Sequence, residues 1–188
     1  MNLKLSLGLA AAAASLSMSV AAADVDWGVH SDPSESASPT VVAGSFVDHY
    51  FFSIPAGFNL LASVTVSNNL TVVFTPPVVL PPLVVFQINN GYYTLFSDGG
   101  SVGVADGGDI PLGNNWMFDG ASGSTVNSVS IGTGDYYYKV WGDAVGVSGG
   151  LYTITSAIAP IPEPGTYAMM LAGLGAVGFV AMRRRQRG

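Results

Sequence analysis

Apolar and polar residues alternate with a period of two through residues 46–158. Clusters of Gly, Asn, Asp and Pro separate the β-branched and aromatic runs at short intervals, which is typical of half-buried strands joined by turns. No helical period is visible in this region, so the pattern predicts an all-β fold, an antiparallel jelly-roll-like β-sandwich. The predicted strands are 46–54, 58–67, 70–74, 83–88, 91–96, 115–118, 125–131, 135–142 and 150–158.

Turn and breaker residues divide the middle of this region. Asn89-Asn90-Gly91 predicts a hairpin turn, since Asn-Gly readily adopts the positive φ that such turns need. Thr75-Pro76-Pro77 and Pro81-Pro82 exclude a central strand, so 78–80 is expected to be an edge or an exposed connection. Residues 97–114 form the longest glycine-rich loop.

The first 23 residues have the layout of a secretory signal. Lys4 precedes an apolar and small-residue run over 5–20, and Ala21 and Ala23 form a small-x-small cleavage site before Asp24. This predicts a signal helix at 1–23 and export, with 24–45 as an acidic N-terminal segment ahead of the sandwich. The alternative is an N-terminal helix that the mature protein retains.

The C-terminus has three consecutive parts. A proline-rich linker at 159–166 contains Pro162, Glu163 and Pro164, a charge-free stretch follows at 167–182, and Arg183, Arg184, Arg185 and Arg187 lie in the tail at 183–188. Counted from Gly165, the 18 uncharged residues would make a helix of about 27 Å, roughly the minimum for crossing a bilayer. The positive-inside rule then places the arginine tail in the cytoplasm and the body outside.

These residues resemble the sorting tag of the PEP-CTERM family of exported bacterial proteins, which combines a Pro-Glu-Pro motif, one short helix and an arginine-rich end. The resemblance covers residues 162–188. It implies an exosortase as partner, a membrane enzyme that processes the tag near the motif, so that Pro162, Glu163 and Pro164 are recognition residues. Because two prolines fix φ and remove backbone donors, this segment is expected to stay extended. A plain linker before a permanent anchor is the alternative.

The charge of the body excludes one class of partner. Between residues 24 and 161 a single lysine, Lys139, faces eleven carboxylates. Such a body repels phosphate backbones, which argues against nucleic-acid binding and leaves cations, neutral glycans or proteins. The absence of cysteine is compatible with an oxidising compartment.

Phe46, Asp48 and Tyr50 fit the FxDxY motif of a subgroup of PEP-CTERM proteins. Together with the stretches 48–57, 134–140 and 150–154, they also resemble bacterial pre-peptidase C-terminal domains, which implies a jelly-roll-like sandwich. On a strand, Asp48 would share one face with large apolar residues. A buried carboxylate there needs turn amides or a hydroxyl as donors, so a structural role is expected for Asp48.

The body contains two further candidate sites with less specific sequence patterns. Asp98, Asp106 and Asp109 lie in the glycine-rich loop and could bind calcium, although their spacing matches no EF-hand and a solvated loop is the alternative. Tyr137 and Trp141 share one face of a predicted strand, and they could stack on sugar rings or belong to the core.

No catalytic motif is found. His30 and His49 have no zinc-binding spacing, and no nucleophile elbow, phosphate loop or dinucleotide fingerprint is present. We therefore expect a non-enzymatic protein without a cofactor other than calcium, exported to the cell surface or extracellular matrix. The family resemblance associates such proteins with exopolysaccharide and biofilm. A carbohydrate- or calcium-binding surface module is the alternative function.

Overall fold

The computed structural model describes residues 23–30, 34–75, 80–119, 125–160 and 164–185. The predicted signal residues 1–22, together with Pro162, Glu163 and Arg187, lie outside these ranges. The described part contains strands β1 (Ala23–Val29), β2 (Ser34–Ala37), β3 (Thr40–Val41), β4 (Gly44–Ile54), β5 (Phe58–Ser67), β6 (Leu70–Val72), β7 (Leu83–Phe86), β8 (Ile88–Ser97), β9 (Ile110–Pro111), β10 (Trp116–Met117), β11 (Asn127–Ser130), β12 (Gly134–Ala144) and β13 (Gly150–Pro160), and helix α1 (Pro164–Arg185).

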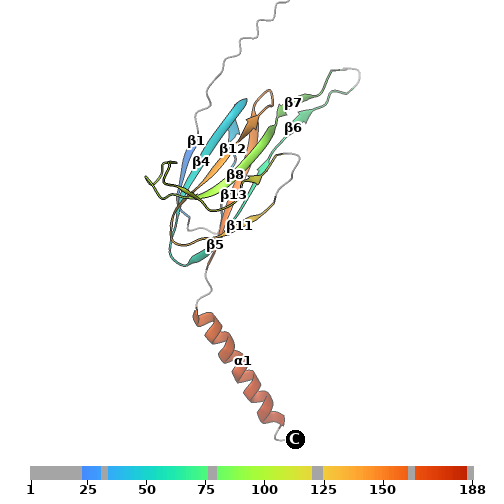
Figure 1. Cartoon of the computed structure of the whole chain (residues 1–188). Helices are drawn as coiled ribbons and strands as arrows, with labels where there is room; N and C mark the ends of the chain where they lie inside the picture. Colours follow the sequence, from blue (N-terminus) through green and yellow to red (C-terminus); the bar gives the residue numbers. More distant parts are fainter. Residues whose placement is uncertain (1–22, 31–33, 76–79, 120–124, 161–163, 186–188) are drawn as a thin grey trace, which may run out of the picture.

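The strands form two main sheets packed face to face (Figure 1). In the first sheet the order is β1-β4-β12-β8-β10, with β9 also paired to β8, and in the second it is β11-β5-β13-β2, with β3 also paired to β13. A separate ribbon of β6 and β7 extends from the sandwich. The all-β sandwich predicted from the alternation is thus confirmed, with one exception to its antiparallel pairing: β1 runs parallel to β4.

The core lies between the sheets because the strands alternate in and out with the period seen in the sequence. From β4, Phe46, Tyr50, Phe52 and Ile54 point inward and are buried, as the pattern predicted. Tyrosines from three other strands meet them in the core, namely Tyr93, Tyr138 and Tyr152. The inner layer is therefore rich in hydroxyl groups that need hydrogen-bond partners.

The sandwich begins earlier than the sequence predicted. Residues 24–45 were expected to precede it, but β1, β2 and β3 lie there and join both sheets. The reason is weak alternation: β1 buries only Val25 and Trp27 against the core, and β2 contains no large apolar residue. The two-residue β9 was also missed, inside the predicted glycine-rich loop.

The predicted turn at Asn89-Asn90-Gly91 is wrong. These residues lie inside β8, where the pairing with β12 shifts so that Asn90 and Gly91 together face Gly142. Asn90 has φ 50°, so the Asn-Gly pair supplies the positive φ of a β-bulge instead of a hairpin turn.

Candidate functional site

The C-terminal segment follows β13 directly. That strand ends at Pro160 and α1 begins at Pro164, where a proline costs nothing because the first helical turn has no backbone acceptor for its N–H. The apolar side chains that are described on α1 are more than half exposed: Met169, Met170, Leu171, Leu174, Val177 and Met182. Arg183, in the last turn, is exposed as well.

Among the described residues, no helix is both long enough and apolar enough to span a membrane.

Asp48 is the centre of a buried polar chain on the inner face of β4. Its side chain is 1% exposed, and its Oδ2 accepts a 2.5 Å hydrogen bond from the Tyr152 hydroxyl. The Tyr50 hydroxyl lies 2.7 Å from that of Tyr152, which leaves Tyr50 as donor because the Tyr152 proton is committed to Asp48. Burial, together with the neighbouring Tyr50 and Asp48, raises the pKa of Tyr152 well above its usual value.

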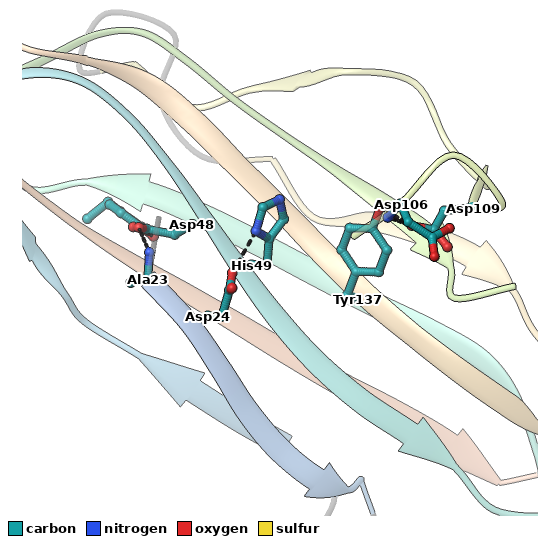
Figure 2. A network of polar contacts seen from close by, with 8 residues as sticks. Ala23, Asp24, Asp48, His49, Asp106, Asp109 and Tyr137 are labelled. Atoms are coloured by element: carbon teal, nitrogen blue, oxygen red, sulfur yellow. Dashed lines mark hydrogen bonds and ion pairs between the residues drawn. The ribbon is translucent and has the colours of Figure 1, made fainter. Parts of the chain in front are cut away.

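The second donor to Asp48 comes from β1. The backbone nitrogen of Ala23 lies 3.1 Å from Asp48 Oδ1 (Figure 2). The expectation that Asp48 needs turn amides or a hydroxyl is met by the Tyr152 hydroxyl, and the backbone nitrogen that also binds Asp48 belongs to a neighbouring strand and not to a turn. Phe46 stacks on Tyr152 at 5.6 Å between ring centroids, so the three residues of the FxDxY motif form one packed unit.

His49 faces the opposite side of β4, as the alternation predicted. Its Nδ1 lies 2.8 Å from Asp24 Oδ1 on β1 (Figure 2), and its ring lies against Phe51 and Tyr137. His30, in contrast, is fully buried between the sheets, where its Nε2 lies 3.1 Å from Ser156 Oγ. With both Ser156 and His30 at 0% exposure, this pair is enclosed by the core in the structure.

The loop aspartates bind the backbone of their own loop. Asp106 accepts hydrogen bonds from the amides of Ser101 and Gly108, which lower its pKa. Asp109 accepts hydrogen bonds from the amides of Gly99 and Asp106. These carboxylates hold the loop in shape, and in the part of the chain that the structure describes no group of three or more acidic or histidine side chains is arranged to hold a metal ion.

Asp98 is different from the other two because it is buried. It is 8% exposed, and its Oδ2 accepts a 2.7 Å hydrogen bond from the Gly103 amide. Its Oδ1 has no hydrogen-bond donor among the described residues. Burial raises the pKa of Asp98, the Gly103 amide opposes that shift, and the charges of Asp109, Asp135 and Asp106 add to it.

Asp98 also lines a pocket between the loop and the edge of the first sheet. The pocket has a volume of about 440 Å³. Three further carboxylates line it, from Asp24 and Asp26 on β1 and Asp135 on β12. Sequence reasoning missed this convergence, because the four aspartates come from three separate segments.

Tyr137 and Trp141 share the outer face of β12 but belong to different clusters. Tyr137 is 3% exposed, stacks on Phe96 at 5.1 Å, and donates a hydrogen bond from its hydroxyl to Asp109 (Figure 2). The loop therefore covers Tyr137, which is buried and not exposed for stacking on a sugar ring. Burial and Asp109 raise the pKa of its hydroxyl.

Trp141 is half-buried and stacks on Tyr92 at 5.9 Å, with rings inclined by 24°. The Lys139 ammonium lies 5.7 Å from the centre of the Trp141 ring. Of the two predicted stacking residues, only Trp141 is thus partly accessible, and its aromatic partner is Tyr92.

The protein is an all-β sandwich followed by an exposed apolar helix. Comparison with known protein families identifies the C-terminal segment. Residues 160–185 match the family described as the PEP-CTERM protein-sorting motif, so the chain carries this sorting signal as predicted. The match includes Pro162, Glu163 and Pro164. The FxDxY subgroup stays a prediction.

Solved structures show distant similarities to the body. One is the pre-peptidase C-terminal domain of a collagenase from Bacillus anthracis, with 11% identity, a TM-score of 0.37, and coverage of 72% of this chain and 93% of that one. Another is CorA, a surface-associated copper-binding protein of Methylomicrobium album BG8, with 11% identity and a TM-score of 0.37. The similarity covers 75% of this chain and 100% of that one. These scores are too low to transfer any property to this chain. No curated protein matches it.

Proposed function

We propose that this protein is an exported surface protein that an exosortase sorts and processes through its C-terminal tag, without catalytic activity of its own. The sorting motif at residues 160–185 carries this proposal. Within it, Pro162 and Glu163 fall between the last strand of the sandwich, which ends at Pro160, and helix α1, which begins at Pro164.

The exposed apolar side chains of α1 support a membrane-bound intermediate. A helix without a polar face needs an apolar environment, and the described sandwich leaves these side chains uncovered. Residues 165–182 carry no charge, so the helix can insert its apolar side chains into a bilayer without burying a charged group. Arginines at its end would stay on the cytoplasmic side, with the sandwich outside.

Mass spectrometry of the C-terminus tests the proposal. In cells that contain an exosortase, the surface-exposed product should lack the arginine tail, and in cells without the enzyme the tail should remain. Replacing Pro162, Glu163 and Pro164 with alanine should retain the tail in both strains. Pro82→Ala, an exposed proline of the body outside residues 160–185, is the control and should be processed normally. An intact tail on the surface protein of enzyme-positive cells would refute the proposal.

The final location, the extracellular matrix with its exopolysaccharide, is part of this proposal and rests on the family resemblance.

The second candidate function, a glycan-binding module, is supported by one observation in the body. Trp141 and Tyr92 form a stacked and partly accessible aromatic pair with Lys139 beside it, a combination that suits the apolar face of a sugar ring.

A glycan array probed with wild type and with Trp141→Ala tests the glycan-binding function. Binding that Trp141→Ala abolishes and Tyr137→Phe leaves intact would establish the module. The calcium alternative at Asp98, Asp106 and Asp109 is tested by calorimetry with calcium alone, where the absence of heat would exclude it.

A further inference from the structure

Trp141 and Tyr92 belong to a longer row of apolar side chains on the outer face of the first sheet. In the register of the strands, Trp141 on β12 lies opposite Val47 on β4 and opposite Tyr92 on β8. Tyr92 in turn lies opposite Met117 on β10. Each of the four is next in sequence to a buried core residue, and since side chains alternate between the faces of a sheet, all four point outward. We refer to these four residues as the apolar strip.

The apolar strip is accessible and has the length of a short glycan. Met117 is 46% exposed, and Val47, Tyr92 and Trp141 are half-buried. The strip crosses the strands in the order β4-β12-β8-β10, of which the first three are seen side by side in Figure 1. Neighbouring strands are about 4.8 Å apart, so the strip is about 14 Å long. One hexose unit of an extended chain advances by nearly one strand spacing, so about three sugar rings fit along it.

A hydrogen-bonding group lies on one side of the apolar strip. Asp143, two residues after Trp141, accepts hydrogen bonds from Ser45 Oγ at 2.7 Å and from Asn90 Nδ2 at 3.1 Å. These two donors fix the carboxylate and lower the pKa of Asp143, so it is charged at neutral pH. A carboxylate can accept about four hydrogen bonds, so part of its capacity is open to sugar hydroxyls.

The charges beside the apolar strip favour a neutral ligand. Residues 139, 141 and 143 share one face of β12, so Lys139 and Asp143 lie on opposite sides of the strip. The Lys139 ammonium is 5.7 Å from the centre of the Trp141 ring, and its charge balances that of Asp143. The body as a whole has eleven carboxylates and one lysine between residues 24 and 161, so it repels an acidic polysaccharide.

We propose that the apolar strip binds a neutral, extended, β-linked glycan whose chain lies across the strands, with about three sugar rings along the strip. This inference rests on the glycan-binding function and adds the ligand class and its orientation. In a pyranose with equatorial hydroxyls, the C–H groups gather on the two ring faces and the hydroxyls lie at the rim. The ring faces contact the strip, while hydroxyls along the two edges of the chain bind Asp143 on one side and Lys139 on the other.

Isothermal titration calorimetry of the full chain with cello-oligosaccharides tests the length of the site. The detergent should have no sugar headgroup, so that its micelles do not compete. The dissociation constant should fall about fivefold from cellobiose to cellotriose, because a third ring contacts the strip. It should change by less than about twofold from cellotetraose to cellohexaose, whose extra rings extend beyond the strip. Equal affinities for cellobiose and cellotriose, or no binding of cellotetraose, would overturn the inference.

Maltotetraose is the matched ligand for the shape of the chain. It contains the same sugar unit and the same number of rings as cellotetraose, but its α-linkages curve the chain away from a flat surface. It should bind at least about tenfold more weakly than cellotetraose. Equal affinity for the two tetrasaccharides would overturn the proposed binding across the strands.

Met117→Ala shortens the apolar strip at its most exposed end. This variant should lose the gain in affinity from cellobiose to cellotriose, while its affinity for cellobiose stays within about twofold of wild type. Ile110→Ala is the matched control, because Ile110 is an exposed apolar residue of β9 in the same sheet but outside the strip. It should keep the gain. A Met117→Ala protein that also keeps it would overturn the inference.

Trp141→Ala distinguishes this inference from the glycan-binding function on which it rests. Binding that requires Trp141, together with the gain from cellobiose to cellotriose, supports both. Binding that requires Trp141 but shows no such gain supports the glycan-binding function and overturns the inference. Binding that Trp141→Ala leaves unchanged overturns both.

Discussion

Replacing Tyr152 with phenylalanine removes a single oxygen from the centre of the sandwich and leaves the packing volume nearly unchanged. That oxygen donates to Asp48 at 2.5 Å and lies 2.7 Å from the Tyr50 hydroxyl. A hydrogen bond to a charged group contributes roughly 1.5–3 kcal/mol, and a buried hydroxyl left without its partner costs roughly 1–3 kcal/mol. We therefore expect Tyr152→Phe to reduce the free energy of unfolding by about 4 kcal/mol.

This loss is a large part of the total stability of a domain, which is about 5–15 kcal/mol. It corresponds to a decrease in melting temperature of roughly 12 °C, at about 3 °C per kcal/mol for a chain of this size. Urea denaturation followed by tryptophan fluorescence measures the free energy, and calorimetry measures the melting temperature.

Tyr136→Phe is the matched control because it is the same chemical change on a strand of the facing sheet. Among the described residues, the Tyr136 hydroxyl bonds to the backbone of Gly132 in a partly exposed turn, so its loss should cost about 1 kcal/mol. Equal losses for the two variants, or a loss below about 1 kcal/mol for Tyr152→Phe, would refute the role given to the polar chain around Asp48.

Three further predictions concern the outer loop and the bulge. Because the pKa of Asp98 is raised in the folded state, its folded form favours the proton, and stability should fall as pH rises from the unfolded value of 3.8 through the folded pKa. Asp98→Asn should therefore melt at a higher temperature than wild type at pH 7, with the difference disappearing below about pH 4, and a constant difference at all pH values would contradict this. Asn90→Ala should lose about 1 kcal/mol in urea denaturation, because alanine tolerates the φ of 50° poorly, and Asn90→Gly should lose much less. Gly142→Ala should cost about 1–3 kcal/mol, since its new Cβ would lie 3.1 Å from the Gly91 backbone, and an unchanged melting temperature would show that β8 can move away.

The sequence predicted those strands whose inward positions carry large apolar side chains. β4 and β5 were located almost to the residue, because residues such as Phe46, Phe52 and Leu61 alternate with smaller or polar ones. β1 and β2 were missed because edge strands bury little. A pattern of apolar residues records the amount of burial, not the presence of backbone pairing.

Some candidate sites could be found from the sequence, and others depend on the order of the strands. The sorting motif was found because it is contiguous, and the need of Asp48 for donors followed from the alternation alone. Tyr152, which lies 104 residues from Asp48, could not be chosen from many hydroxyls without the strand order. The pocket aspartates and the Trp141–Tyr92 pair likewise depend on which strands become neighbours.

The place of β13 in the second sheet determines how the body responds to a pull from its C-terminus. β13 is an interior strand, paired with β5 along its length and with β2 and β3 on its other side. Antiparallel hydrogen bonds lie perpendicular to the strand axis, so tension applied beyond Pro160 loads many of them at once in shear instead of opening them one by one. A protein tethered by this end can therefore bear mechanical force without unravelling from its point of attachment.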